Sequence, residues 1–225
     1  MCIIQLNLHR RKTLDPSKLY VEYYAKLHAE RAMKLWPMRF TKNERPDFIT
    51  KHGEIGMEVT RAAIEEWAQQ EADMNRTFGD EMPGEAVEQT ILADCEDDAI
   101  ASGTKDGEEL PLFELPPDVK EMHIGRVIER IGDKTAALKE YHLCKENWLY
   151  VFSETTGIDR TDMLRVQAYV DAQQGALLFD KVLVKVGCLL YVLCRGEELT
   201  SFELGGRTLY RLYMRARRLS LRHNW

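Results

Sequence analysis

Apolar residues along the chain recur with two different periods, and each change of period marks an expected element. Spacings of three and four residues, as in Ile124, Val127 and Ile131, are typical of an amphipathic helix. Short runs of β-branched and aromatic residues are typical of strands, and the fully apolar run at 147–153 predicts a strand covered on both faces of a sheet. The expected elements are helices at 18–36, 62–78, 123–142 and 160–174, and strands at 48–50, 55–60, 147–153, 179–186 and 188–194, the last two joined by a turn at Gly187. This order predicts an α/β fold in which helices flank a mixed central β-sheet.

The stretch 44–62 predicts a tight hairpin that brings two carboxylates together. Its four-residue loop, 51–54, has Gly53 at the third position, where a positive φ carries no steric cost. If the two strands flank this loop directly, Asp47 is paired with Glu58 across the hairpin. Their side chains would then share one face, with Cβ atoms about 4.5–5.5 Å apart.

A pair of acids at that separation predicts a bound cation. Two neighbouring carboxylates repel each other, so the arrangement is stable only with a cation or a proton between them. Carboxylate oxygens and retained waters are the ligands that Mg²⁺ or Mn²⁺ prefers, which makes Asp47 and Glu58 candidate metal ligands. The alternative is ordinary hairpin polarity, because a slip of one residue would place the two acids on opposite faces.

Two further charged residues fall on or beside apolar helix faces. Glu22 lies at the edge of the apolar face of the helix predicted over 18–36, where a carboxylate needs a partner. Lys134 lies inside the apolar arc of the helix predicted over 123–142. Its side chain could extend to the edge of that face and reach water, or it could meet the acids of the hairpin.

Composition and charge predict one domain, residues 1–225, with an acidic insertion. The chain has 225 residues, of which 44% are hydrophobic, and no run of eighteen apolar residues that would span a membrane. Thirteen acids and two lysines give residues 79–120 a net charge of −11, which predicts an insertion or lid outside the central sheet. The five cysteines include no C-x-x-C pair, so reduced thiols and a cytoplasmic protein are expected, rather than a structural zinc site.

The C-terminal segment has the opposite charge. Residues 206–225 contain six arginines and no acid. Such a segment is suited to phosphate contacts, because each phosphate that is neutralised releases counterions. The candidates for binding a nucleic-acid backbone are Arg207, Arg211, Arg215 and Arg218. A solvated C-terminal helix with no ligand is an equally good interpretation.

Three segments, "RPDF", "IGMEVT" and "NWLYVF", resemble the PD-(D/E)xK nuclease superfamily, which has the restriction-endonuclease-like fold. Pro46-Asp47 matches the first half of the family motif, and Glu58-Val59-Thr60 occupies the second half. The family core is a helix, a three-stranded antiparallel unit, a crossover helix and a further strand. The resemblance covers about residues 18–151 and is closest to a subgroup of bacterial and phage proteins; the acidic segment 79–120 is not part of that core.

The resemblance implies an enzyme that hydrolyses phosphodiester bonds of nucleic acid, with DNA as the expected substrate. Asp47, Glu58 and the backbone carbonyl of Val59 would bind Mg²⁺ or Mn²⁺. Glu22 is the candidate for the first-helix glutamate that can also be a metal ligand in this family. In the mechanism that the resemblance implies, the ion activates a water and polarises the phosphoryl group.

The chain departs from the motif at Thr60, where the family has a lysine. In related members the lysine function can move to the following helix, so Lys134 is the third candidate catalytic residue beside Asp47 and Glu58. The missing motif lysine also favours an alternative, a catalytically degenerate nuclease fold that binds nucleic acid or protein. A third hypothesis is an interaction protein whose acidic segment is its working surface. The choice between DNA and RNA stays open, as does a homodimer.

Overall fold

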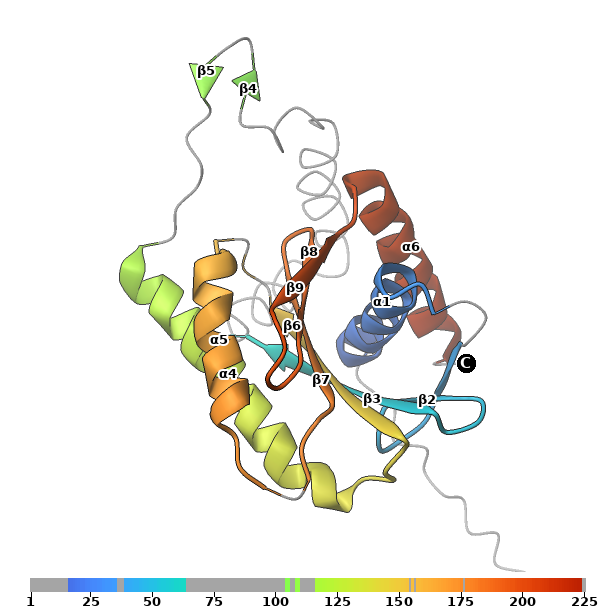
Figure 1. Cartoon of the computed structure of the whole chain (residues 1–225). Helices are drawn as coiled ribbons and strands as arrows, with labels where there is room; N and C mark the ends of the chain where they lie inside the picture. The colour runs from blue at the N-terminus through green and yellow to red at the C-terminus, as the bar shows by residue number, and fades with distance from the viewer. Residues whose placement is uncertain are drawn as a thin grey trace, which may run out of the picture.

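A seven-stranded mixed β-sheet forms the centre of the protein (Figure 1). The structure, a computed structural model, describes residues 16–35, 39–63 and 116–223 except 154, 156 and 176, together with 104–105 and 108–109. The strand order is β1-β2-β3-β6-β7-β8-β9, with β1 Phe40–Lys42, β2 Phe48–Thr50, β3 Ile55–Ala62, β6 Glu146–Ser153, β7 Lys181–Val186, β8 Leu189–Leu193 and β9 Thr200–Glu203. The helices are α1 Pro16–Ala32, α4 Pro117–Ala137, α5 Arg160–Ala172 and α6 Gly206–His223, and a 3₁₀ turn, Leu138–Glu140, follows α4. The α/β class predicted from the sequence is confirmed.

The hairpin of β2 and β3 has the predicted register. Phe48 lies opposite Met57 in an antiparallel ladder, and Gly53 in the loop has a φ of 67°. β1 pairs antiparallel with β2 and completes a three-stranded unit. β3 continues to Ala62, so the helix predicted from residue 62 does not begin there; the rest of its range, 64–78, lies outside the described residues.

A crossover through α4 connects β3 to β6, which lies beside it in parallel. β6 also pairs in parallel with β7, so it is flanked by strands on both edges. Its residues Trp148 to Val151 are buried, as expected of a strand covered on both faces. β7 and β8 form the predicted hairpin, and Gly187 in its turn has a φ of 54°.

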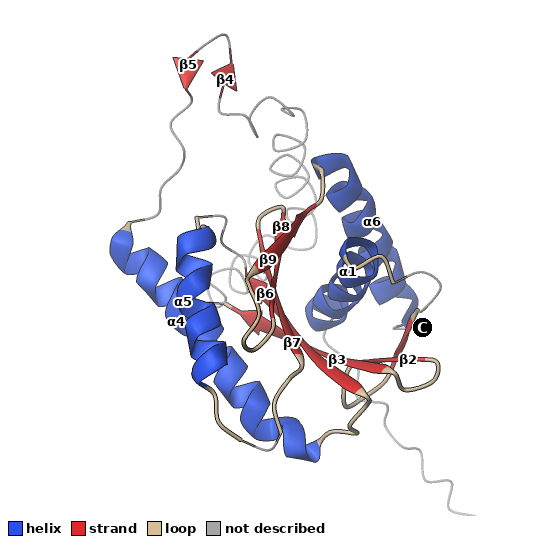
Figure 2. Cartoon of the chain, in the orientation of Figure 1, coloured by secondary structure: helices blue, strands red, loops and turns tan. Residues whose placement is uncertain are grey.

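Helices cover both faces of the sheet and enclose two cores (Figure 2). α1 and α6 lie on one face, where Leu19 packs with Met57 of β3 and Tyr150 of β6. α4 and α5 lie on the other face, where Ile131 and Met163 pack with residues of β6, β7 and β8. The alternation of side chains along β3 and β6 supplies both cores at once.

Several predicted boundaries are wrong by a few residues. α1 ends at Ala32 rather than at 36. α4 begins at Pro117 rather than at 123, because a proline suits the first helical position and Asp118 stabilises the first turn. Two strands of the central sheet, β1 and β9, were not predicted. Both are short, and β9 is an exposed edge strand without an apolar run.

Most of the acidic segment 79–120 falls outside the described residues. Thr104–Lys105 (β4) and Glu108–Glu109 (β5) pair with each other in a two-stranded sheet separate from the central one, whereas a helical or irregular segment was expected here. Pro117–Lys120, by contrast, belong to α4. None of the helices in the described part of the chain is long and apolar enough to cross a membrane. The three cysteines within it, Cys144, Cys188 and Cys194, are free thiols.

Candidate functional site

Asp47 and Glu58 are positioned by the hairpin of β2 and β3. The ladder pairs Phe48 with Met57, which places Asp47, one residue before β2, opposite Glu58 in β3. Both acids are buried, at 5% and 6% exposure. The backbone N–H of Val59 donates a hydrogen bond of 2.9 Å to Asp47 Oδ2, which fixes this carboxylate beside β3. The predicted juxtaposition of the two acids on neighbouring strands is therefore confirmed.

Glu58 receives two donors from the segment around the end of α4. Lys134 Nζ lies 2.7 Å from Glu58 Oε1, and the hydroxyl of Tyr141 donates to the same oxygen at 3.0 Å. The prediction that Lys134 turns toward the carboxylates rather than into bulk water is confirmed. Glu58 Oε2 is buried and has no hydrogen-bond partner among the described residues. One oxygen of this acid is therefore held in place and the other is left for a ligand.

Glu22 of α1 joins the cluster through a lysine that was not predicted. Lys42, at the end of β1, lies 2.6 Å from Glu22 Oε2 and 3.5 Å from Asp47 Oδ1. Its ammonium also lies 4.9 Å from the ring centre of Phe48. Because β1 has only three residues, no periodic pattern in the sequence predicts its pairing with β2. The sequence feature that points to a contact between Lys42 and Asp47 is their separation by five residues.

The close packing of acids changes the affinity of Asp47 for its proton. Burial first, and then the charges of Glu58 and Glu22, raise the pKa of Asp47 from 3.8 to about 7, although Lys42 and the N–H of Val59 act in the opposite direction. Burial and the neighbouring Glu58 also raise the pKa of Tyr141, so its hydroxyl stays protonated as a donor. Burial and the repulsion among the carboxylates together therefore outweigh the compensation that Lys42 and the N–H of Val59 supply to Asp47.

A cavity of about 320 Å³ opens beside Glu22 and Glu58, whereas Asp47 is not among the residues that line it. It is lined by Lys18, Val21, Glu22, Glu58, Val59, Thr60, Arg61 and Lys134. Thr60 of β3 and Lys134 of α4 thus border the same space. The Lys134 side chain, which extends from α4, therefore borders the same cavity that a lysine side chain at position 60 of β3 would border.

The donor set is suited to a hard divalent cation. Asp47 and Glu58 offer carboxylate oxygens, and Oε2 of Glu58 is buried without a hydrogen-bond partner in the part of the chain that the structure describes. Across the same residues, no three His, Cys, Asp or Glu side chains are grouped closely enough to hold an ion by themselves. Mg²⁺ commonly uses only one or two carboxylates and completes its shell with water and phosphate oxygens, so a pair fits.

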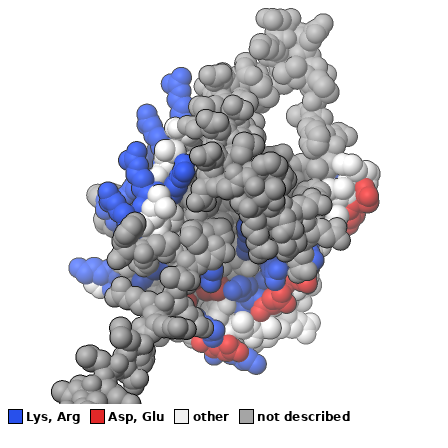
Figure 3. Space-filling model, turned by 180° about the vertical axis from the view of Figure 1, so that it is seen from behind, with Lys and Arg blue, Asp and Glu red and all other residues white. Residues whose placement is uncertain are grey.

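The four candidate phosphate-binding arginines lie apart from this cavity, on α6. Arg207, Arg211, Arg215 and Arg218 are all exposed. Seen from behind, basic side chains gather along the edge of the molecule where α6 lies (Figure 3). A second cavity, of about 610 Å³, is lined by residues of α6, including Arg211, Arg215 and Arg218 but not Arg207. α6 packs on α1, where Tyr213 meets Tyr20 with ring centres 5.4 Å apart.

Comparisons of the chain with protein-family models, with curated proteins and with solved structures find no match.

Proposed function

We propose that the protein is a metal-dependent phosphodiester hydrolase that acts on nucleic acid, with DNA as the expected substrate. The observation that carries this proposal is the pairing of two buried carboxylates, Asp47 and Glu58, with the Lys134 ammonium 2.7 Å from one of them. Two neighbouring acids and a lysine, of which Glu58 and Lys134 border an open cavity, are the groups that this reaction needs.

The order of elements supports the resemblance on which the proposal partly rests. α1, the antiparallel unit β1-β2-β3, the crossover helix α4 and the parallel strand β6 follow one another as in the core of the PD-(D/E)xK superfamily. Asp47 and Glu58 stand at the positions of the motif acids within that order. The lysine of the motif is replaced by one on α4.

Each residue then has a defined part in the reaction. Asp47, Glu58 and the carbonyl of Val59 would hold Mg²⁺ or Mn²⁺. Glu22, which the sequence offered as a further ligand, is not grouped closely enough with these two acids to complete a three-carboxylate site. The bound ion would lower the pKa of a water molecule and polarise the phosphoryl oxygen. Lys134 would orient the attacking water and stabilise the charge that develops on the phosphate.

Lys42 and Thr60 favour a second candidate function, a nucleic-acid- or protein-binding module without catalysis. Thr60 removes the usual lysine, and the Lys42 ammonium already lies between Glu22 and Asp47. In a degenerate site, Lys42 would replace the divalent cation permanently. Divalent-cation binding discriminates between the two functions, because only the hydrolase requires it.

The deciding experiment combines cation binding with a cleavage assay. Calorimetric titration with Mg²⁺ and Mn²⁺ is followed by incubation with supercoiled plasmid, linear duplex and single-stranded DNA. We expect cleavage that EDTA abolishes and that Asp47→Asn and Glu58→Gln each reduce at least a hundredfold. Glu54→Gln is the matched control, since Glu54 lies in the same hairpin and pairs with Lys145 at 3.1 Å, outside the cluster. Absence of divalent-cation binding would refute the hydrolase.

A further inference from the structure

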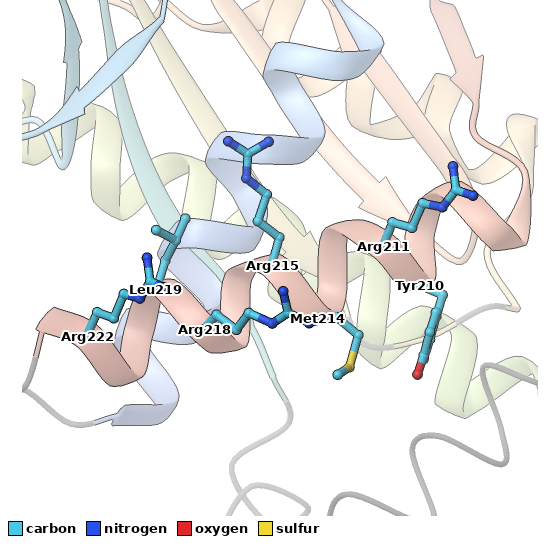
Figure 4. Close-up of a pocket in the computed structure, with 7 residues that line it drawn as sticks. All are labelled: Tyr210, Arg211, Met214, Arg215, Arg218, Leu219 and Arg222. Carbon is cyan, nitrogen blue, oxygen red and sulfur yellow. The ribbon is translucent and has the colours of Figure 1, made fainter.

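The exposed face of α6 carries an ordered row of arginines. Arg211, Arg215, Arg218 and Arg222 are spaced by four, three and four residues, which confines them to an arc of about 60° on the helix. They all line the cavity of about 610 Å³ (Figure 4). From the first to the last, the row extends for about 16 Å along the helix axis. The row is long enough to contact several phosphates of one strand, since each nucleotide of B-form DNA advances by 3.4 Å along the helix axis.

These arginines have no acidic partner among the described residues. No ion pair involves any of the four, and α6 itself contains no acid. Several arginines elsewhere in the chain do have acidic partners: Arg126 pairs with Glu129 and Arg165 with Glu121. Four neighbouring cations that have no acidic partner in the described part of the chain repel one another, so binding a polyanion would lower this repulsion.

Apolar side chains flank the arginine row on both sides. Tyr210 and Met214 lie along one flank and Leu219 along the other, and all three are half-buried. Tyr210 and Met214 point away from the side toward which Arg211 and Arg215 extend (Figure 4). The cavity therefore combines guanidinium groups for phosphates with an aromatic ring and a thioether beside them.

We propose that the cavity along α6, from here on the α6 groove, binds single-stranded nucleic acid. The phosphates would lie on the arginine row and the bases against Tyr210 and Met214. The inference rests on the proposed function for its choice of polyanion. Alternating charge and aromatic surface is the pattern by which single strands are held without sequence preference. A duplex keeps its bases stacked inside, so it would engage the arginines and leave the apolar flank unused. An acidic peptide would likewise need only the arginines.

The test measures binding in EDTA, where cleavage cannot interfere. Fluorescence anisotropy with a labelled twelve-nucleotide oligothymidylate should give a logarithmic salt slope of about −3, the value for four phosphates of a single strand. Arg215→Ala and Arg218→Ala should each reduce the magnitude of that slope by about 0.7. Arg217→Ala is the matched control: it removes an exposed arginine of the same helix that does not line the groove, and should change the affinity less than twofold.

The stacking part of the proposal is tested at Tyr210. Tyr210→Ala should weaken oligothymidylate binding about tenfold or more and leave binding of a twelve-base-pair duplex nearly unchanged, whereas Tyr210→Phe should keep full affinity. A duplex bound as tightly as the single strand, an ineffective Tyr210→Ala, or equal competition by hexaglutamate would each overturn the inference.

The same titration separates this inference from the proposed function. If binding in EDTA is found but no divalent cation supports cleavage, the hydrolase is refuted and the groove stands. If the protein cleaves DNA but its α6 groove does not bind oligothymidylate, the hydrolase stands and the groove proposal is refuted.

Discussion

Lowering the pH should destabilise the protein through one buried histidine that anchors α1, the helix that carries Glu22. His28 is fully buried, and its Nδ1 lies 2.7 Å from the hydroxyl of Tyr150 in β6. Burial lowers the pKa of His28 from 6.5 to about 3, and the charge of Lys185 acts in the same direction. The Nε2 atom has no hydrogen-bond partner among the described residues, so a proton there would be buried without an acceptor.

The direction and size of the change in stability follow from the difference between the pKa of His28 in the folded protein and its pKa in the unfolded chain. Below pH 6.5 the unfolded chain binds a proton at His28 that the folded protein does not bind until about pH 3. The stabilisation is therefore complete above pH 6.5 and is lost as the pH falls toward 3. A difference of about 3.5 pKa units corresponds to on the order of 5 kcal/mol of unfolding free energy across that interval.

The assay is urea unfolding followed by circular dichroism between pH 3.5 and 8, in EDTA. The variant is His28→Phe with Tyr150→Phe, since removal of both partners of a buried hydrogen bond costs far less than removal of one. The difference in stability between wild type and double variant should change by several kcal/mol between pH 7.5 and 4. Taking this difference cancels contributions from groups common to both proteins, including Asp47. His52→Gln, at an exposed loop histidine, should show no such change. A difference independent of pH would refute the reasoning.

Three further predictions concern the site and its hairpin. Lys134→Ala should lower the cleavage rate about a hundredfold or more with folding and cation binding preserved, measured as kcat on linear duplex; full activity would exclude its role. Lys42→Met should tighten Mg²⁺ binding about tenfold by calorimetry, because the substitution removes an ammonium group that competes with Mg²⁺ for Glu22 and Asp47. Weaker Mg²⁺ binding would mean instead that Lys42 holds the acids in position. Gly56→Ala should lower stability by about 1–3 kcal/mol in urea unfolding, since its Cβ would meet the Cys144 Sγ atom and the Pro46 Cγ atom at 2.9 Å; unchanged stability would show that those neighbours move freely.

The hairpin could be predicted from sequence because local chemistry determines its register. A four-residue loop with Gly53 at a positive φ leaves one pairing that buries the apolar positions of both strands, and Asp47 and Glu58 then face each other. Lys134 was found in a similar way, because the helical period alone places it on the buried face of α4. Both inferences needed only the geometry of one element or of one tight turn.

Other features depend on contacts that no local pattern records. β1 has three residues and β9 four, and each is a strand only because a longer neighbour supplies a ladder. Lys42 was missed for this reason, as its place beside Glu22 depends on where α1 packs over β1. The end of α1 was placed four residues too late because Met33 and Trp36 continue the apolar period after the helix has ended.

Thr60 and Lys134 show how two positions far apart in the sequence can reach the same part of the site. The two residues are more than seventy positions apart, yet both border the cavity beside Glu58. β3 carries the glutamate, and α4 crosses over β3 on the way to β6, so any lysine on the facing turn of α4 can approach that carboxylate. The acids have no such freedom, because their separation depends on a single hairpin register. For this reason a one-residue insertion in the loop 51–54 should abolish the cluster, whereas moving the lysine between β3 and α4 preserves it.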